Sequence, residues 1–127
     1  MIVVDASAAV LGLVNDGDAR ALLSSESLVC PHLVDAEVVH ALRAQVLRGQ
    51  LKPDLGRLLV DRWSQLGVQR FGVVGLLHRV WELRENLSAY DATYVGVAEA
   101  LGCAMLTADR RLARAPGPRC PITVVRT

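Results

Sequence analysis

This chain of 127 residues has few aromatic side chains: one Phe, two Tyr and two Trp. A hydrophobic core must therefore be built mainly from Leu, Val and Ala, within a hydrophobic fraction of 52%. Such a core is typical of layered α/β structures. At this length the chain can bury roughly two thirds of its unfolded surface, so folding requires no disulfide or structural metal. A single domain over residues 1–127 is expected.

Paired cysteines and long apolar runs are also missing. Cys30, Cys103 and Cys120 form no CxxC motif and no even-numbered set, which argues against a disulfide framework. No run reaches the ~20 apolar residues that span a bilayer, and the chain opens on a strand rather than on a basic segment with an apolar signal core. These features predict a reduced, cytoplasmic protein that does not engage a membrane.

Lysine is almost absent: Lys52 is the only lysine, and the other residues counted as Lys or Arg are all Arg. The net charge of +1 gives no overall field that would hold a polyanion, so a nucleic acid would have to bind a local patch. The arginine guanidinium can bind two phosphate oxygens at once, which the lysine ammonium does less well. The arginine bias fits phosphate binding, but a compositional origin explains it at least as well.

Short β-like runs alternate with longer segments of helical period along the whole chain. The alternation predicts a three-layer α/β/α sandwich around a central, mostly parallel sheet. Two helices follow one another without an intervening strand, so we expect a helical hairpin at about residues 33–66. The expected strands are 2–4, 28–30, 68–71, 104–106 and 122–125, and the expected helices are 6–14, 18–25, 33–47, 53–66, 73–86, 89–101 and 109–113.

Four acidic residues occupy positions that suggest chemistry. Asp5 and Asp109 closely follow apolar strands, so in a parallel sheet both would lie outside the carboxyl ends of the strands, where open α/β sheets bind ligands. Asp91 stands in the first turn of an expected helix. Glu37 falls within the apolar stripe of its helix, and a lone carboxylate rarely enters a core without a partner. The pattern predicts a shared carboxylate pocket.

Helix capping explains three of these acids about as well when each is taken alone. Asp is a favoured N-cap residue that contributes about 1 kcal/mol, which suits both Asp5 and Asp109. The spacing from Ser88 to Asp91 matches a capping box, in which the acid reaches back to the serine amide. Only Glu37 has no such explanation. The nearby Asp35 lies at the edge of the apolar stripe and is expected to be solvated.

Four carboxylates in one pocket require a compensating positive charge. Two of them ~4 Å apart repel by about 4 kcal/mol at an effective dielectric of ~20. Protonation, arginine or a divalent ion can provide the compensation, and oxygen ligands without paired His or Cys suit Mg²⁺ or Mn²⁺. The spacing of His32, His40 and His78 is unlike that of zinc ligands.

Taken together, the order and spacing of the acids resemble the PIN-domain nucleases, and within them the VapC toxins of prokaryotic toxin–antitoxin pairs. The matching segments are spread along the whole chain. They are Val3-Val4-Asp5-Ala6-Ser7, Asp35-Ala36-Glu37-Val38, the stretch from Trp81 to Ala92, and Leu106-Thr107-Ala108-Asp109.

The resemblance implies a PIN-like fold and a metal-dependent endoribonuclease that cleaves RNA phosphodiesters with a metal-activated water. It also implies a toxin that a cognate antitoxin inhibits and that forms homodimers. Two alternatives are open: a PIN nuclease of RNA processing, and a non-catalytic metal-binding interaction module. The implied catalytic and metal-binding residues are Asp5, Glu37, Asp91 and Asp109, with Ser7 and Thr107 as supporting hydroxyls and Arg84, ranked first, Arg110 and Arg111 as candidates for phosphate binding.

Overall fold

The computed structural model describes all 127 residues and contains one five-stranded sheet. All neighbouring strands are parallel, so the expected sheet is confirmed, with no antiparallel strand. The central strand pairs with its neighbour residue by residue, Val4 opposite Leu106. In spatial order, the strands are β3 (Gln69–Phe71), β2 (Leu28–Pro31), β1 (Ile2–Val4), β4 (Ala104–Thr107) and β5 (Ile122–Val124).

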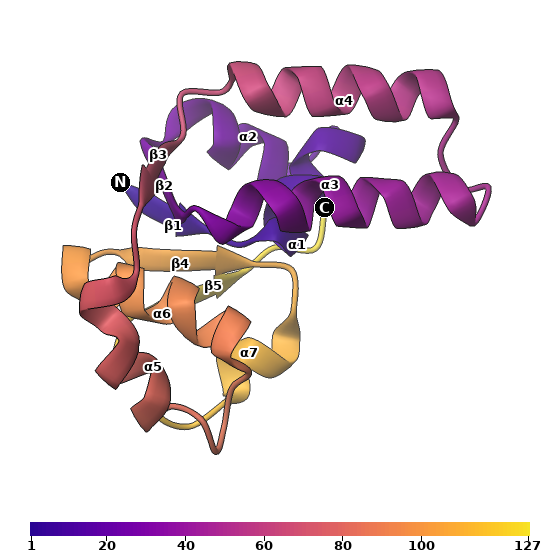
Figure 1. Cartoon of the computed structure of the whole chain (residues 1–127). Coiled ribbons are helices and arrows are strands. Elements are labelled where there is room, and N and C mark those ends of the chain that lie inside the picture. The colour runs from indigo at the N-terminus through magenta and orange to yellow at the C-terminus, as the bar shows by residue number, and fades with distance from the viewer.

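Helices cover both faces of the sheet, which confirms the three-layer α/β/α sandwich (Figure 1). One face carries α1 (Ala6–Val14), α2 (Asp18–Ser25), α3 (Leu33–Leu47) and α4 (Pro53–Gln65). The other carries the 3₁₀ helix η1 (Val74–Leu76), α5 (Leu77–Glu82), α6 (Ala89–Leu101) and the short α7 (Arg110–Arg114). None of these helices combines the length and apolar character that crossing a bilayer needs.

The two helices α3 and α4 pack against each other as a hairpin on one side of the sheet (Figure 1). Asp35 of α3 accepts a hydrogen bond from Trp63 Nε1 of α4 at 2.8 Å and two more from the Arg70 guanidinium of β3, also at 2.8 Å. The Asp35 side chain is 43% exposed, so it is partly solvated as expected, but its carboxylate is also paired. Its carboxylate ties two helices and an edge strand together, and the Arg70 guanidinium lowers its pKa.

The buried apolar side chains form one cluster of 31 residues, most of them Val, Leu and Ala, as the scarcity of aromatics predicts. Helix ends agree with the sequence signals where those are strong. Gly102, for example, ends α6 in the left-handed conformation, with φ of 65°, which residues with a Cβ rarely adopt.

The predicted helix over residues 73–86 is wrong in its extent. The structure has only η1 and α5 there, followed by turns to Leu87. Gly75 weakens a helix by about 1 kcal/mol relative to Ala. Val80 is the buried residue of α5, and Leu83 in the turn that follows is also in the core, so these side chains are buried without a continuous helix. The other predicted elements agree with the structure within one or two residues.

Candidate active site

The carboxyl ends of β1 and β4 meet in the middle of the sheet, and two of the predicted acids lie there. Asp5 caps α1, where its Oδ1 accepts a hydrogen bond from the Ala8 amide at 2.9 Å. Asp109 caps α7, where its Oδ1 accepts from the Arg111 amide at 2.9 Å. The capping interpretation is thus correct for both, but it leaves further oxygen lone pairs on each carboxylate.

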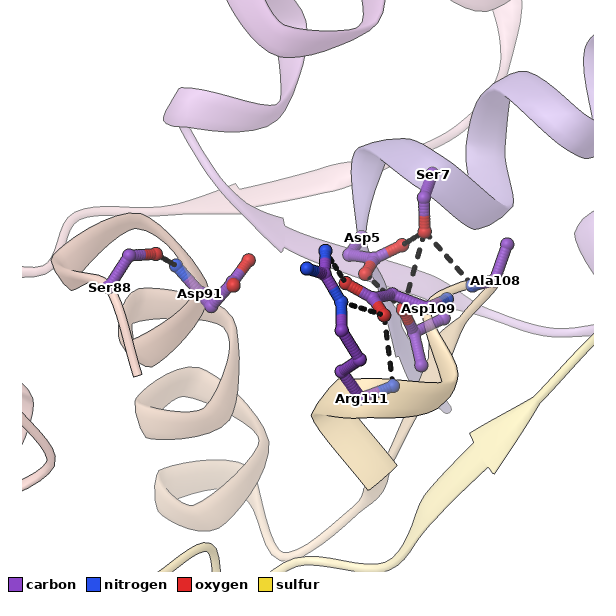
Figure 2. Close-up of polar contacts among 8 residues, drawn as sticks. Asp5, Ser7, Ser88, Asp91, Ala108, Asp109 and Arg111 are labelled. Atoms are coloured by element: carbon purple, nitrogen blue, oxygen red, sulfur yellow. Dashed lines mark hydrogen bonds and ion pairs between the residues drawn. The ribbon is translucent and has the colours of Figure 1, made fainter. Parts of the chain in front are cut away.

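Asp5 is the most firmly held of the acids, with only 6% of its surface exposed. Its Oδ1 also accepts from Ser7 Oγ at 2.6 Å, and its Oδ2 accepts from Thr107 Oγ1 at 2.5 Å. The same hydroxyls accept hydrogen bonds in turn, Ser7 from the Ala108 amide at 2.9 Å and Thr107 from the Asp109 amide at 3.0 Å. The network joins the turn after β1 to the turn after β4 (Figure 2).

Asp91 faces these turns from the first turn of α6, with the Arg111 guanidinium between (Figure 2). Ser88 caps α6 by accepting from the Asp91 amide at 3.1 Å, but the returning bond of a capping box, from the Ser88 amide to the Asp91 carboxylate, is not made. Arg111 Nε and Nη2 each lie 3.2 Å from an oxygen of Asp109. Asp91, Asp109 and Arg111 line a pocket of about 250 Å³.

Glu37 has its own partner on the opposite helix layer. Its Oε1 accepts a hydrogen bond from the hydroxyl of Tyr94 on α6 at 2.5 Å, and Tyr94 is only 1% exposed. The sequence predicted that Glu37 needs a partner but did not identify Tyr94. A signal was present, because a buried tyrosine usually needs a hydrogen-bond partner and Tyr94 lies three residues after Asp91, on the same side of its helix.

Burial, mutual repulsion and hydrogen bonds shift the pKa values of these acids in different directions. Burial raises the pKa of Asp5, and the charge of Asp91 adds to this, while the hydrogen bonds from Ser7, Thr107 and Ala8 oppose it. Burial, and then the neighbouring Asp109, also raise the pKa of Asp91. By contrast, hydrogen bonds from Arg111 lower the pKa of Asp109. The positive charge at the site therefore comes from Arg111 and acts mainly on Asp109, with a smaller effect on Asp91.

Of the three candidate arginines, only Arg111 contacts an acid of the site, and its side chain is 91% exposed. Arg84 lies over the ring of Trp81, 4.7 Å from its centroid, and donates to the Trp81 carbonyl at 3.1 Å. Arg110 is exposed and makes no ion pair. The placement of these side chains does not favour Arg84 over the other two.

The donor set suits a hard divalent cation, since it consists of carboxylate and hydroxyl oxygens. The acids do not meet at one point, however: no group of three or more His, Cys, Asp or Glu side chains is close enough to hold an ion. Neighbouring carboxylates repel one another, and hydrogen-bond donors or positive side chains offset that repulsion. Here those partners are Ser7 and Thr107 for Asp5, Arg111 for Asp109 and Tyr94 for Glu37.

A family model described as the PIN domain matches residues 2–118, nearly the whole chain. The chain belongs to the PIN-domain family. Ribonuclease VapC9 of Mycobacterium tuberculosis is 54% identical to this PIN domain over 125 residues, which cover 98% of both chains. Ribonuclease VapC1 of the same organism is 42% identical over 129 residues, 98% of this chain and 97% of that protein. The resemblance to the VapC group is thus confirmed.

Solved structures share the fold at lower sequence identity. Mycobacterium tuberculosis VapC20, described as a sarcin-ricin loop cleaving toxin, superposes with a TM-score of 0.64 at 21% identity, covering 90% of this PIN domain and 94% of that chain. VapBC2 from Rickettsia felis, bound to a DNA fragment from their promoter, gives 0.69 at 14% identity, with 98% of each chain covered. At these identities the likeness shows the fold alone.

Proposed function

We propose that this PIN domain is a metal-dependent endoribonuclease and the toxin of a toxin–antitoxin pair. One observation carries the proposal: Asp5, Asp91 and Asp109 come from three separate elements to the carboxyl ends of β1 and β4, in a chain that belongs among the VapC ribonucleases. Ligands of open α/β sheets bind at this edge.

We assign Asp5, Asp91 and Asp109 as the residues that would hold Mg²⁺ or Mn²⁺. When bound, the cation would offset the charge of the phosphate and lower the pKa of the attacking water. Asp5 is already oriented, because Ser7 and Thr107 fix both of its oxygens. Asp91 and Asp109 are less constrained and lie on the same pocket, so they supply the adjustable part of the site.

Glu37 is proposed as the group that takes a proton from the attacking water. Tyr94 holds one of its oxygens and leaves the other free to accept. Glu37, together with Ala6 and His40, lines a shallow hollow of about 500 Å³ that adjoins Asp5 through Ala6. Arg111 is proposed to bind an RNA phosphate once its pairing with Asp109 is relieved, and the exposed Arg110 lies beside it.

A cleavage assay with purified protein tests the proposal. RNA substrates are incubated with Mg²⁺ or Mn²⁺, with EDTA, and with the variant Asp91→Asn, using Asp54→Asn as a matched control because Asp54 is an exposed acid on α4. We expect cleavage only with metal, loss of cleavage in Asp91→Asn, and full activity in Asp54→Asn. Equal cleavage in EDTA would exclude the metal-dependent function.

A cognate antitoxin is proposed to dock on the α3–α4 hairpin. The two helices form a groove of about 220 Å³ that carries apolar side chains beside two arginines, and Val39 and Leu47 on its rim are exposed. The likeness to VapBC2 supports such a partner. The test is expression in the cytoplasm of a host cell, which should arrest growth. Co-expression of the protein encoded next to the gene should relieve the arrest caused by the wild type. It should not relieve the arrest caused by Leu47→Asp. Light scattering after size-exclusion chromatography measures the proposed homodimer.

A second candidate is a non-catalytic interaction module that receives a partner's arginine. The observation in its favour is the Arg111 guanidinium, which already occupies the space beside Asp109 and Asp91. The same assay, run beside a thermal melt, separates the two functions. Stabilisation by metal without cleavage of any RNA would favour the interaction module.

A further inference from the structure

Two cysteines that are far apart in sequence, Cys103 and Cys120, line the same pocket at the amino ends of β4 and β5. Cys103 immediately precedes β4, and Cys120 comes two residues before β5. Both are half-buried and line one pocket of about 390 Å³, together with Glu99 of α6. This pocket lies at the amino ends of the strands, whereas the acids lie at the carboxyl ends, so the proposed nuclease function makes no use of it.

The sheet sets the register of this cysteine pair. Met105 lies opposite Ile122, and the Met105 amide donates to the Pro121 carbonyl at 2.9 Å, so the residue next to Cys120 is already bonded to β4. Cys103 and Cys120 each come two residues before that opposed pair. Continued at this spacing beyond the strand ends, the register brings Cys103 opposite Cys120. Neighbouring strands are about 4.8 Å apart, within the roughly 4.4–6.8 Å between Cα atoms that a disulfide spans.

The backbone at both cysteines is held in place. The Cys103 amide donates to the Ala98 carbonyl at 3.0 Å, directly after the left-handed turn that ends α6. Next to Cys120, the Arg119 amide donates to Glu99 Oε2 at 2.7 Å. Glu99 is itself fixed by the Arg79 guanidinium at 2.7 and 3.1 Å. The two thiols are therefore held near each other by α6 on one side and by the strand ladder on the other.

We propose that Cys103 and Cys120 form a reversible disulfide within the folded protein, a modification site independent of the nuclease function. The oxidant is a small disulfide such as oxidised glutathione. One cysteine thiolate attacks it and releases a first glutathione thiol, and the second cysteine attacks the mixed disulfide and releases the other. Two protein thiols lose two electrons and two protons, which leave with the two glutathione thiols. A thiol reductant reverses the exchange.

The third cysteine cannot take part. Cys30 lies in β2, which β1 separates from β4, and its Sγ donates to the Val4 carbonyl at 3.1 Å. Burial raises the pKa of the Cys30 thiol to about 12, so it is almost never a thiolate at neutral pH. Burial, the Glu99 carboxylate and Cys103 also raise the pKa of Cys120.

The test treats the folded full-length chain with oxidised glutathione and compares it with Cys30→Ala, Cys103→Ser and Cys120→Ser. We expect the free thiols to fall from the three cysteines to one in the wild type, with the same bond in Cys30→Ala and no internal bond in the other two. Trypsin cuts the intervening chain at its arginines, so the bond links peptides 85–110 and 120–126 until a reductant is added.

The melting temperature provides a second measurement, because the bond closes a loop that contains β4 and α7 and restricts the unfolded chain. The oxidised protein should melt about 5 °C or more above the reduced one, with no such rise in Cys103→Ser or Cys120→Ser treated alike. Separate glutathione adducts on the two cysteines, a bond that forms only in denaturant, or a lower melting temperature on oxidation would each overturn the proposal.

Discussion

Two halves of the acid site are built differently. In the first, Asp5 and Thr107 are buried, 6% and 0% exposed, and short hydrogen bonds join β1 to β4. In the second, Asp91 and Asp109 face a pocket, and their compensating charge comes from Arg111, which is 91% exposed. A buried network holds one geometry, whereas an exposed ion pair exchanges readily with solvent and contributes little to stability.

The difference shows where a ligand can act. Asp5 cannot move without breaking the connection between two strands, so it provides a fixed point of reference for a cation or phosphate. The Asp91 and Asp109 side can rearrange at low cost, because Arg111 can leave and be replaced by another positive charge. We expect changes in the first half to affect both stability and activity, and changes in the second half to affect activity and charge balance with little effect on the fold.

Replacing Asp5 by Asn should have the largest effect. Asn is also a good N-cap, so α1 should persist, but the amide cannot carry the negative charge that we assign to binding a divalent ion. We expect metal-dependent RNA cleavage to fall at least about 100-fold, a loss of ~3 kcal/mol in transition-state stabilisation. Cleavage is measured at saturating Mn²⁺, with circular dichroism to verify the fold. Wild-type cleavage by a folded Asp5→Asn protein would remove Asp5 from the mechanism.

Replacing Thr107 by Val should give the next largest effect, now on stability. The change keeps the shape but removes the hydroxyl that donates to Asp5 Oδ2 and accepts from the Asp109 amide. Leaving a buried partner unsatisfied costs about 1–3 kcal/mol. Urea unfolding should show this loss in Thr107→Val and much less of it in the matched control Thr107→Ser, which keeps the hydroxyl.

The same unfolding experiment sharpens the comparison on the other half of the site. Arg111→Gln also removes hydrogen bonds to an acid, but at an exposed side chain, so we expect no measurable change in unfolding. A loss in Arg111→Gln as large as that in Thr107→Val would mean that both halves are equally rigid, and the distinction drawn between them would be wrong.

Replacing Tyr94 by Phe should have a smaller effect. Glu37 loses the hydrogen bond that its Oε1 accepts from Tyr94, but the carboxylate is partly accessible and water can replace the hydroxyl. We expect a destabilisation of about 1 kcal/mol and a several-fold loss of cleavage. Tyr90→Phe on the exposed side of the same helix is the matched control. If Tyr94→Phe leaves cleavage unchanged, Glu37 does not depend on Tyr94 for its orientation.

Much of the fold could be predicted from the chain because its signals are local. The alternation of apolar runs with helical periods predicts five strands and the helices between them, and Gly102 marks the end of α6. The failure at residues 73–86 has a different origin. There the helical period continues, but Val74 is 85% exposed and the chain leaves the helix after Glu82 while Leu83 stays in the core, which no local pattern reveals.

Candidate site residues could be named from the sequence, but their geometry could not. Order along the chain identified the acids, and capping correctly described Asp5 and Asp109. It could not show that Glu37 pairs with Tyr94, that Asp35 binds Arg70, or that Arg111 rather than Arg84 stands beside the acids. Each of these contacts joins elements that are remote in sequence or depends on which way a long side chain turns.

The smallest effect we predict concerns Asp91 and pH. The folded pKa of Asp91 lies above its ordinary value of 3.8, so ionisation of this carboxyl opposes folding. Its contribution to stability is therefore present below that value and is lost as the pH rises through the folded pKa. Asp91→Asn removes the charge and should raise the melting temperature at pH 7 by about 1–3 °C, with no gain at pH values below 3.8.

A divalent metal should reverse the order of the melting temperatures of the wild type and Asp91→Asn. Saturating Mn²⁺ binds only the folded state and should stabilise the wild type more than Asp91→Asn, because the variant lacks one of the proposed ligands. The negative charge of Asp91 also interacts favourably with the N-terminus of α6, which opposes the gain from removing it. If Asp91→Asn melts below the wild type at pH 7 without metal, that helix interaction outweighs burial, and the second half of the site is already balanced without a cation.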